Sequence, residues 1–253
     1  MNKDKIIILI LAAGRGTRMK SEEPKALTKL KGKPFLHHIL ETIKKLDLKI
    51  KPFIVVGYKK ETIKEMLGDE ASYVEQREQL GTGHAVMSAK NSIVHPHEMV
   101  LVLSADQPTI SVETLEKIIT THLEKRPAIT IGTVVVPDYE DWRIGLYSNF
   151  GRIVRGSDGK VEKIVEFKNT TPEEKLIKEV NPALYLFDAD WLWKNIDRIE
   201  MDKVKGEYKL TDMINLAFKE HKKIEAVPVI NVLEGLQPNS KEELEILEKL
   251  MVE

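Results

Sequence analysis

Short apolar runs alternate with amphipathic stretches along the first half of the chain. The runs at residues 6–11, 53–56, 99–103 and 129–136 predict buried strands, and the stretches at 34–46, 61–67, 83–92 and 112–123 predict helices. This alternation predicts a Rossmann-like α/β fold: a mixed, mostly parallel sheet flanked by helices. In such sheets ligands bind at the carboxyl ends of the strands.

The pattern changes after about Pro137. Residues 151–155 and 160–167 predict a hairpin, with Asp158-Gly159 in its turn. Further strands are expected at 181–187 and 224–229. Helices are expected from Ala189, from Thr211 and over 241–251. We find no linker rich in glycine, serine or proline, so residues 1–253 are expected to form a single domain.

Composition excludes several classes of function. The 253 residues carry 39 basic and 40 acidic side chains, a net charge of −1, which argues against a nucleic-acid partner. The absence of cysteine excludes disulfides, thiolate catalysis and cysteine-bound zinc. The absence of cysteine also fits a reducing cytoplasm, so we expect a cytoplasmic protein. No apolar run has the length of a transmembrane helix, so no membrane partner is expected.

A glycine-rich turn follows the first apolar run, with the sequence L-A-A-G-R-G-T-R-M from Leu11 to Met19. Gly14 and Gly16 permit unusual backbone angles, and consecutive N–H groups in such a turn can bind phosphate oxygens. Arg15, Arg18 and Lys25 add positive charge nearby, so the turn is suited to a polyphosphate. Neither the dinucleotide fingerprint nor the P-loop fits, because Met19 stands where each requires glycine.

The stretch from Leu11 to Met19, with Pro24-Lys25 after it, resembles the L-A-A-G-x-G-T-R-M…P-K signature of sugar-nucleotide pyrophosphorylases. The resemblance is strongest to the uridyltransferase domain of bacterial bifunctional N-acetylglucosamine-1-phosphate uridyltransferases. It implies a GT-A-like fold with a nucleotide half at about 1–136 and a sugar-facing half at about 137–253.

The resemblance also implies a reaction. A sugar-1-phosphate, N-acetylglucosamine-1-phosphate, would attack the α-phosphorus of a nucleoside triphosphate, UTP, and release pyrophosphate. Arg18 and Lys25 would be catalytic, because they offset charge on the triphosphate. Six residues of the turn would bind the nucleotide: Leu11, Ala12, Ala13, Gly14, Gly16 and Thr17.

A second motif, Q-R-E-Q-L-G-T-G-H-A, runs from Gln76 to Ala85. It resembles the base-reading loop of the same uridyltransferases, which implies that Gln76 and Gly81 contact uracil and that Thr82 lies beside the nucleotide. The alternative is an ordinary loop that caps a helix. For His84 we favour a structural role.

Two residues are candidate ligands of Mg²⁺. Asp106 ends an apolar run in S-A-D-Q-P, and it matches the metal-binding aspartate of the family's G-D-x-P. Asn239, in E-G-L-Q-P-N-S, matches the asparagine of the family's E-x-x-G-[VI]-N-[ND]-R. The alternatives are that Asp106 is a cap or turn residue, and that Asn239 or Ser240 caps the final helix.

Three residues are candidate sugar contacts by the same resemblance: Gly151 in F-G-R-I-V-R, Glu166 in I-V-E-F-K and Asn181 in N-P-A-L-Y. The family has N-[TS]-G-[IV]-Y at the last of these, so Pro182 and Ala183 depart from it. G-E-Y-K-L-T-D at 206–212 resembles the family's G-E-Y-Y-L-T-D, where the tyrosine and threonine border the pocket.

Two other functions remain open. One is a nucleotidyltransferase with another base or acceptor, of the cytidylyl or molybdopterin type. The other is a non-catalytic subunit that senses nucleotide sugars; such subunits often lose the triphosphate-binding cations, and the presence of Arg18 and Lys25 favours an enzyme. The chain contains no hexapeptide repeats, so no acetyltransferase activity is expected. The sequence leaves the oligomeric state unknown.

Overall fold

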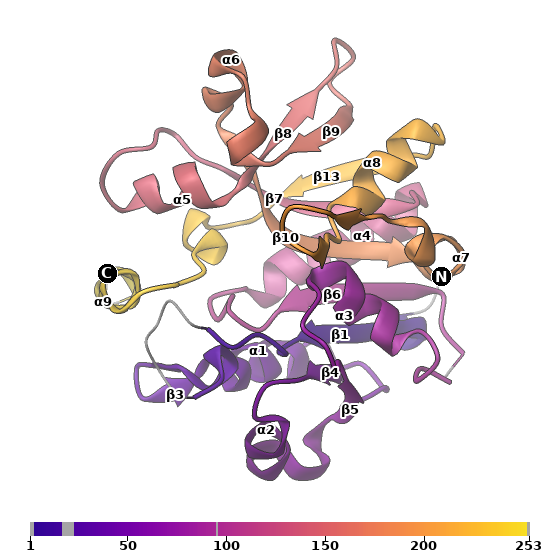
Figure 1. The fold of residues 1–253 in the computed structure, drawn as a ribbon, viewed down its shortest axis with the longest axis vertical. Coiled ribbons are helices and arrows are strands. Elements are labelled where there is room, and N and C mark those ends of the chain that lie inside the picture. Colours follow the sequence, from indigo (N-terminus) through magenta and orange to yellow (C-terminus); the bar gives the residue numbers. More distant parts are fainter. Residues whose placement is uncertain (1–2, 17–22, 95, 252–253) are drawn as a thin grey trace.

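A mixed sheet of nine strands forms the centre of the molecule in the computed structural model, which describes residues 3–16, 23–94 and 96–251 (Figure 1). The strands of this sheet are β1 (Ile6–Leu11), β4 (Phe53–Val56), β5 (Ser72–Glu75), β6 (Met99–Ser104), β7 (Ile129–Val135), β8 (Gly151–Arg155), β9 (Val161–Val165), β10 (Glu179–Asp188) and β13 (Ile224–Pro228). Two short ribbons are formed by β2 (Lys29–Leu30) with β3 (Lys33–Pro34) and by β11 (Met201–Asp202) with β12 (Glu207–Tyr208).

The helices α1 to α8 lie in the connections between strands, and α9 follows the last strand, β13. They are α1 (Phe35–Lys44), α2 (Lys60–Leu67), α3 (Thr82–Ala89), α4 (Val112–Lys125), α5 (Ile144–Asn149), α6 (Pro172–Lys175), α7 (Ala189–Asn195), α8 (Asp212–Lys219) and α9 (Lys241–Leu250). Among the described residues, none of these helices is long and apolar enough to cross a membrane.

The strand order of the sheet is β13-β7-β10-β6-β1-β4-β5, and the hairpin β8–β9 branches from β10. β1 pairs in parallel with β4 and β6, and β13 pairs in parallel with β7. β10 lies antiparallel between β6 and β7. The prediction of a mixed, mostly parallel sheet with flanking helices is therefore confirmed.

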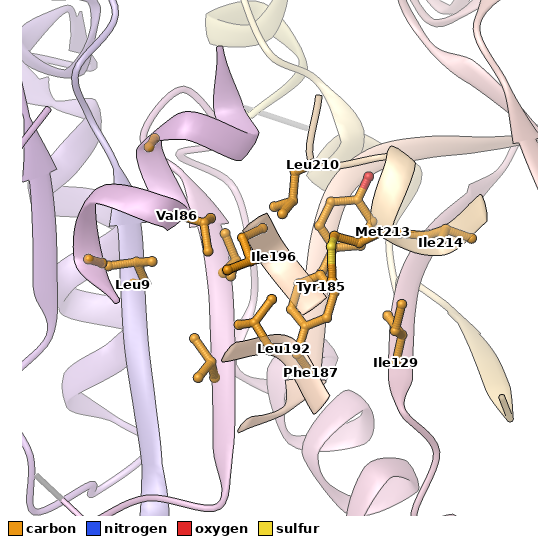
Figure 2. Packing of buried hydrophobic residues seen from close by; sticks show 14 of the residues in the cluster. Leu9, Val86, Ile129, Tyr185, Phe187, Leu192, Ile196, Leu210, Met213 and Ile214 are labelled. Carbon is orange, nitrogen blue, oxygen red and sulfur yellow. The ribbon is translucent and has the colours of Figure 1, made fainter. Parts of the chain in front are cut away.

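The strands are apolar on both faces because helices cover both faces of the sheet. Ile6, Ile8 and Ile10 pack in one cluster with buried side chains of α1, α2 and α4. Ile7 and Leu9 pack in the opposite cluster with side chains of α3, α7 and α8. Figure 2 shows part of this second cluster, where helix side chains gather around two aromatic residues of β10.

Several element ends differ from the sequence-based prediction. α3 ends at Ala89 rather than at 92, because Lys90 and Ser92 donate their N–H groups to the carbonyls three residues earlier, those of Met87 and Ala89. The second hairpin strand ends at Val165 rather than at 167. Beyond it the Asn169 N–H bonds to the Glu166 carbonyl in a 3₁₀ turn.

The histidine of α4 gives a prediction about stability and pH. His122 is 1% exposed, its Nδ1 lies 2.9 Å from the Thr130 hydroxyl, and burial lowers the pKa of its ring to about 4 from 6.5. Between these pH values the unfolded chain binds a proton that the folded chain excludes. Stability is therefore lost as the pH falls from about 6.5 to about 4, by about 3 kcal/mol in total.

A His122→Leu variant should lose less free energy of unfolding than the wild type over this interval. The measurement is the free energy of unfolding from urea denaturation at a series of pH values. The slope of this free energy against pH is compared between the two proteins, because the constant change in stability caused by the mutation does not affect the slope. Equal slopes for the two proteins would contradict this assignment.

Candidate active site

A cavity of about 260 Å³ opens at the carboxyl ends of β1 and β6, where a parallel sheet places its ligands. Seven of the residues predicted to bind nucleotide line it: Leu11, Ala12, Ala13, Gly14, Gln76, Gly81 and Thr82. Lys25, predicted to be catalytic, and Asp106, predicted to bind metal, also line it. Two motifs that are about 60 residues apart in the chain thus share one wall.

The glycine-rich turn leaves β1 in a defined direction. The Ala12 N–H bonds to the Val55 carbonyl at 2.9 Å, which holds the start of the turn against β4. Gly16 has a φ of +65°, and a Cβ there would lie 2.8 Å from the Cβ of Lys25. Glycine is needed at this position so that the turn and Lys25 can approach. Thr17 and Arg18, the other predicted site residues of the turn, lie outside the described residues.

The second motif folds around the amide of Gln76, which is 3% exposed. Its Nε2 donates to the Gly81 carbonyl at 3.0 Å and lies 3.1 Å from Nδ1 of His84. Gly81 has a φ of +95°, and a Cβ there would lie 2.6 Å from the carbonyl oxygen of Tyr208. The backbone of this loop is therefore held close to β12, and the His84 ring contacts the Gln76 amide.

Thr82 joins the two halves of the chain. Its hydroxyl accepts a hydrogen bond from the Leu210 N–H at 3.1 Å, and the Tyr208 N–H donates to the Leu80 carbonyl at 2.7 Å. The segment from Gln76 to Ala85 and the segment that carries G-E-Y-K-L-T-D are thereby fixed to each other.

Lys25 lies where three distant segments meet. Its ammonium nitrogen is 2.6 Å from Oδ2 of Asp106 and 2.7 Å from Oδ1 of Asn239, which is 214 residues away in sequence. The side chains of Lys25 and Asp106 are 13% and 20% exposed. The structure thus brings together one predicted catalytic residue and both predicted metal ligands.

The Asp106 carboxylate is held in its ionised form. Burial by itself raises the pKa of Asp106, but the ammonium of Lys25 and the hydroxyl of Ser104, which donates to Oδ1 at 2.6 Å, outweigh burial and hold the pKa below its usual value. The cap of α4 is Ser111, which accepts from the Thr114 N–H, so Asp106 is not a helix cap.

The donor set fits a hard divalent cation. Asp106 and Asn239 direct a carboxylate and an amide oxygen toward one positive charge, and Mg²⁺ takes oxygen ligands of this kind. Within the described residues no group of three or more histidine, aspartate or glutamate side chains could hold a metal. A cation here would take its other ligands from phosphate oxygens and water. Ser240, rather than Asn239, caps α9.

The three predicted sugar contacts lie outside the wall of this cavity. Gly151 of β8 and Asn181 of β10 are paired neighbours, and Glu166 follows β9. Glu166 accepts from the Thr211 hydroxyl at 3.3 Å and lines a second cavity of about 470 Å³, together with Lys209 and other polar residues.

The Asn181 amide is already engaged inside the protein. Its Nδ2 donates to the Tyr185 hydroxyl at 2.7 Å, and its Oδ1 accepts from the Ala183 N–H at 3.1 Å. Ala183, at the position where the family has glycine, has a φ of +61° at an irregularity of β10. The chain keeps the left-handed backbone there without glycine, which costs conformational energy.

Six residues that line this cavity were not among the predicted site residues: Ala26, Gln79, Ala85, Ser104, Ala105 and Glu207. Gln79 donates to the Gln76 carbonyl at 3.1 Å and so supports the loop that follows Gln76. Gln79 belongs to the motif Q-R-E-Q-L-G-T-G-H-A and Glu207 to G-E-Y-K-L-T-D, and membership of these motifs was the available signal.

The family model of the MobA-like NTP transferase domain matches residues 8–212. "Bifunctional protein GlmU" of Bacillus licheniformis is 38% identical over 238 residues, which are 94% of this chain and 50% of the relative. "Bifunctional protein GlmU" of Desulfotalea psychrophila is 37% identical over 240 residues, 94% of this chain and 68% of the relative. The chain thus spans about half the length of most of these curated relatives.

Two solved structures share the fold. UDP-glucose pyrophosphorylase complexed with UDP-glucose has a TM-score of 0.76 at 18% identity, covering 97% of this chain and 98% of that one. The 4-diphosphocytidyl-2C-methyl-D-erythritol synthase of Anaerococcus prevotii has a TM-score of 0.67 at 16% identity, with full coverage of both chains. These similarities establish the GT-A-like architecture predicted from the sequence.

Proposed function

The chain belongs to the family of MobA-like NTP transferase domains, and from that premise we propose that residues 1–253 act as one nucleotidyltransferase domain. The proposed reaction joins UTP and N-acetylglucosamine-1-phosphate to give a nucleotide-diphosphate sugar and pyrophosphate. The observation that carries the proposal is the convergence of Lys25, Asp106 and Asn239 beside a glycine-rich turn that suits phosphate.

The proposed chemistry needs alignment and charge neutralisation more than covalent catalysis. An oxygen of the sugar phosphate forms a bond to the α-phosphorus, and the bond from that phosphorus to the departing pyrophosphate breaks. The attacking oxygen is already anionic, so no general base is required. Lys25 and Arg18 would offset the negative charge that gathers on the triphosphate.

Asp106 and Asn239 are the residues that would hold Mg²⁺. When bound, the cation would supply positive charge to the phosphates of both substrates. The ammonium of Lys25, which now contacts both oxygens, would then bind phosphate oxygens.

Gln76 supports the choice of uracil as the base. Its Nε2 donates to the Gly81 carbonyl and lies beside Nδ1 of His84, and these contacts fix the orientation of the amide. The amide oxygen Oε1 is then the atom that can accept a hydrogen bond from a ligand. An acceptor at this position suits the N3–H of uracil and opposes cytosine, whose N3 is itself an acceptor. The sugar assignment rests on the motif resemblance at Gly151, Glu166 and Asn181.

The test is pyrophosphate release with Mg²⁺, across four nucleoside triphosphates and a panel of sugar-1-phosphates. We expect pyrophosphate release by the wild type with UTP and N-acetylglucosamine-1-phosphate. In the Asp106→Ala variant we expect the dependence of pyrophosphate release on Mg²⁺ to be lost. Release with a different pair would keep the reaction class and correct the substrates. Nucleotide binding without release from any pair would support a sensing subunit instead.

A further inference from the structure

We propose that Glu234 and Gln107 are positioning residues that set the spacing between Asp106 and Asn239. The inference rests on the proposed function, because it concerns the two side chains proposed to hold the divalent cation. Asp106 lies in the loop after β6, at residues 105–111, and Asn239 ends the segment 231–239 that precedes α9. The two loops come from opposite halves of the chain, so contacts between them are needed to fix the distance between Asp106 and Asn239.

The carboxylate of Glu234 contacts both loops. The side chain is only 2% exposed. Its Oε2 accepts from the Ser111 N–H of the first loop at 3.0 Å, and its Oε1 accepts from the Asn231 N–H of its own loop at 3.0 Å. One buried carboxylate therefore uses one oxygen for each loop.

Gln107 adds a second connection directly beside Asp106. It is 1% exposed, and its Nε2 donates to the Glu234 carbonyl oxygen at 2.8 Å. The Thr109 hydroxyl donates to the Leu233 carbonyl at 2.9 Å. Three hydrogen bonds thus join a five-residue stretch, 107–111, to the turn Val232–Gly235.

The position of Asn239 depends on these bonds because residues 236–239 form neither helix nor strand. The segment is held at its far end by the Asn239 N–H, which bonds to the Glu243 carboxylate of α9 at 2.7 Å. Between the ends, Gln237 donates to the Pro182 carbonyl at 2.5 Å. Hydrogen bonds that orient metal ligands are typically worth a 10- to 100-fold change in metal affinity. Removing the hydrogen bonds of Glu234 should therefore lower the affinity for the cation, with a smaller effect on the thermal stability of the protein.

The experiment measures binding of Mn²⁺ in the presence of UTP, by electron paramagnetic resonance of the free ion. The variants are Glu234→Gln and Gln107→Met, with the midpoint of thermal unfolding recorded for each. Glu234→Gln keeps the shape of the side chain but turns an N–H₂ group toward a backbone donor. We expect each variant to bind Mn²⁺ roughly tenfold more weakly than the wild type.

Gln107→Met separates positioning from stability. Oε1 of Gln107 is buried and has no hydrogen-bond partner among the described residues, so methionine removes an unsatisfied acceptor together with the connecting donor. Its thermal midpoint should stay near that of the wild type while its Mn²⁺ affinity falls. The control is Glu225→Gln, which removes a partly buried carboxylate of β13 that pairs with Lys125 at 2.9 Å, away from both loops. This control should bind Mn²⁺ as the wild type does.

In steady-state assays both positioning variants should need more Mg²⁺ for half-saturation and recover most of their kcat at saturating Mg²⁺. Wild-type affinity for Mn²⁺ in both variants, with or without a lower thermal midpoint, would overturn the inference. That result together with pyrophosphate release by the wild type would leave the proposed function standing. Absence of both Mn²⁺ binding and pyrophosphate release in the wild type would overturn the two together.

Discussion

Replacing Lys25 with methionine is expected to lower kcat/KM for pyrophosphate release by roughly a thousandfold. The ammonium lies within 2.7 Å of both Asp106 and Asn239, and Lys25 is the one cationic residue among the described residues that line the cavity proposed to bind nucleotide. Methionine keeps the length of the side chain and removes the charge. Arg18→Ala is expected to cost turnover by orders of magnitude as well.

The matched control for this prediction is Lys29→Met. Lys29 is an exposed residue of β2, four positions along the chain, and its loss should leave turnover near the wild-type value. Circular dichroism should show that all three variants are folded. Near-normal turnover in both Lys25→Met and Arg18→Ala would refute the proposed mechanism.

Replacing Arg152 with methionine is expected to destabilise the protein by roughly 3 kcal/mol. Arg152 is 0% exposed, and its guanidinium carbon lies 5.0, 5.1 and 5.3 Å from the ring centroids of Tyr139, Tyr147 and Phe167. Nη1 and Nη2 donate to the carbonyls of Phe150 and Tyr147 at 2.7 and 2.8 Å. Burial lowers the pKa of Arg152, and the aromatic faces and carbonyls are what stabilise its charge.

Methionine fills similar space but leaves the two carbonyls without their donors. The measurement is the free energy of unfolding from urea titration. Arg155→Met is the matched control on the same strand, because Arg155 is partly exposed and pairs with Glu179, and its effect should be much smaller. A methionine variant as stable as the wild type would mean that the cost of burying the guanidinium cancels its contacts.

The Arg152 prediction has a functional consequence, because this residue anchors β8 next to Gly151, a proposed sugar contact. In a folded Arg152→Met protein, the KM for the sugar phosphate should rise more than the KM for UTP. Arg152→Lys should not restore it, because a lysine ammonium cannot reproduce the planar donor geometry of a guanidinium.

The sequence by itself determined the features that depend on residues close together in the chain. Apolar runs specified the core strands, with β4 predicted at its observed bounds, because side chains of a strand buried on both faces are apolar at every position. Gly16 of the first turn and Gly81 of the second motif have positive φ and would place a Cβ in close contact, as expected of glycine. Gly14 has neither a positive φ nor a close neighbour, so the expectation of an unusual backbone angle there is wrong. Seven of the nine residues predicted to bind nucleotide line one cavity in the structure, and their role in nucleotide binding stays a prediction.

The short elements escaped prediction for the opposite reason. β2, β3, β11 and β12 have two residues each, and α5 and α6 have six and four, so they are too short to show a period. The position of β10, antiparallel between β6 and β7, was not predictable either. It depends on which strands pair, and no property of residues 179–188 alone specifies the neighbouring strands.

Tertiary structure decided the rest of the site. Only packing shows that Asn239 reaches Lys25 from 214 residues away. The loops that carry Asp106 and Asn239 are joined by hydrogen bonds that Gln107 and Ser111 donate to Glu234, and no local sequence pattern specifies these contacts. Arg152 in its motif has the charge of a surface residue, and it is buried because aromatic rings from three separate segments close around it. Residue type and local periodicity can be read directly from the sequence. Contacts between distant segments depend on the total free energy of packing those segments together, which no single segment determines.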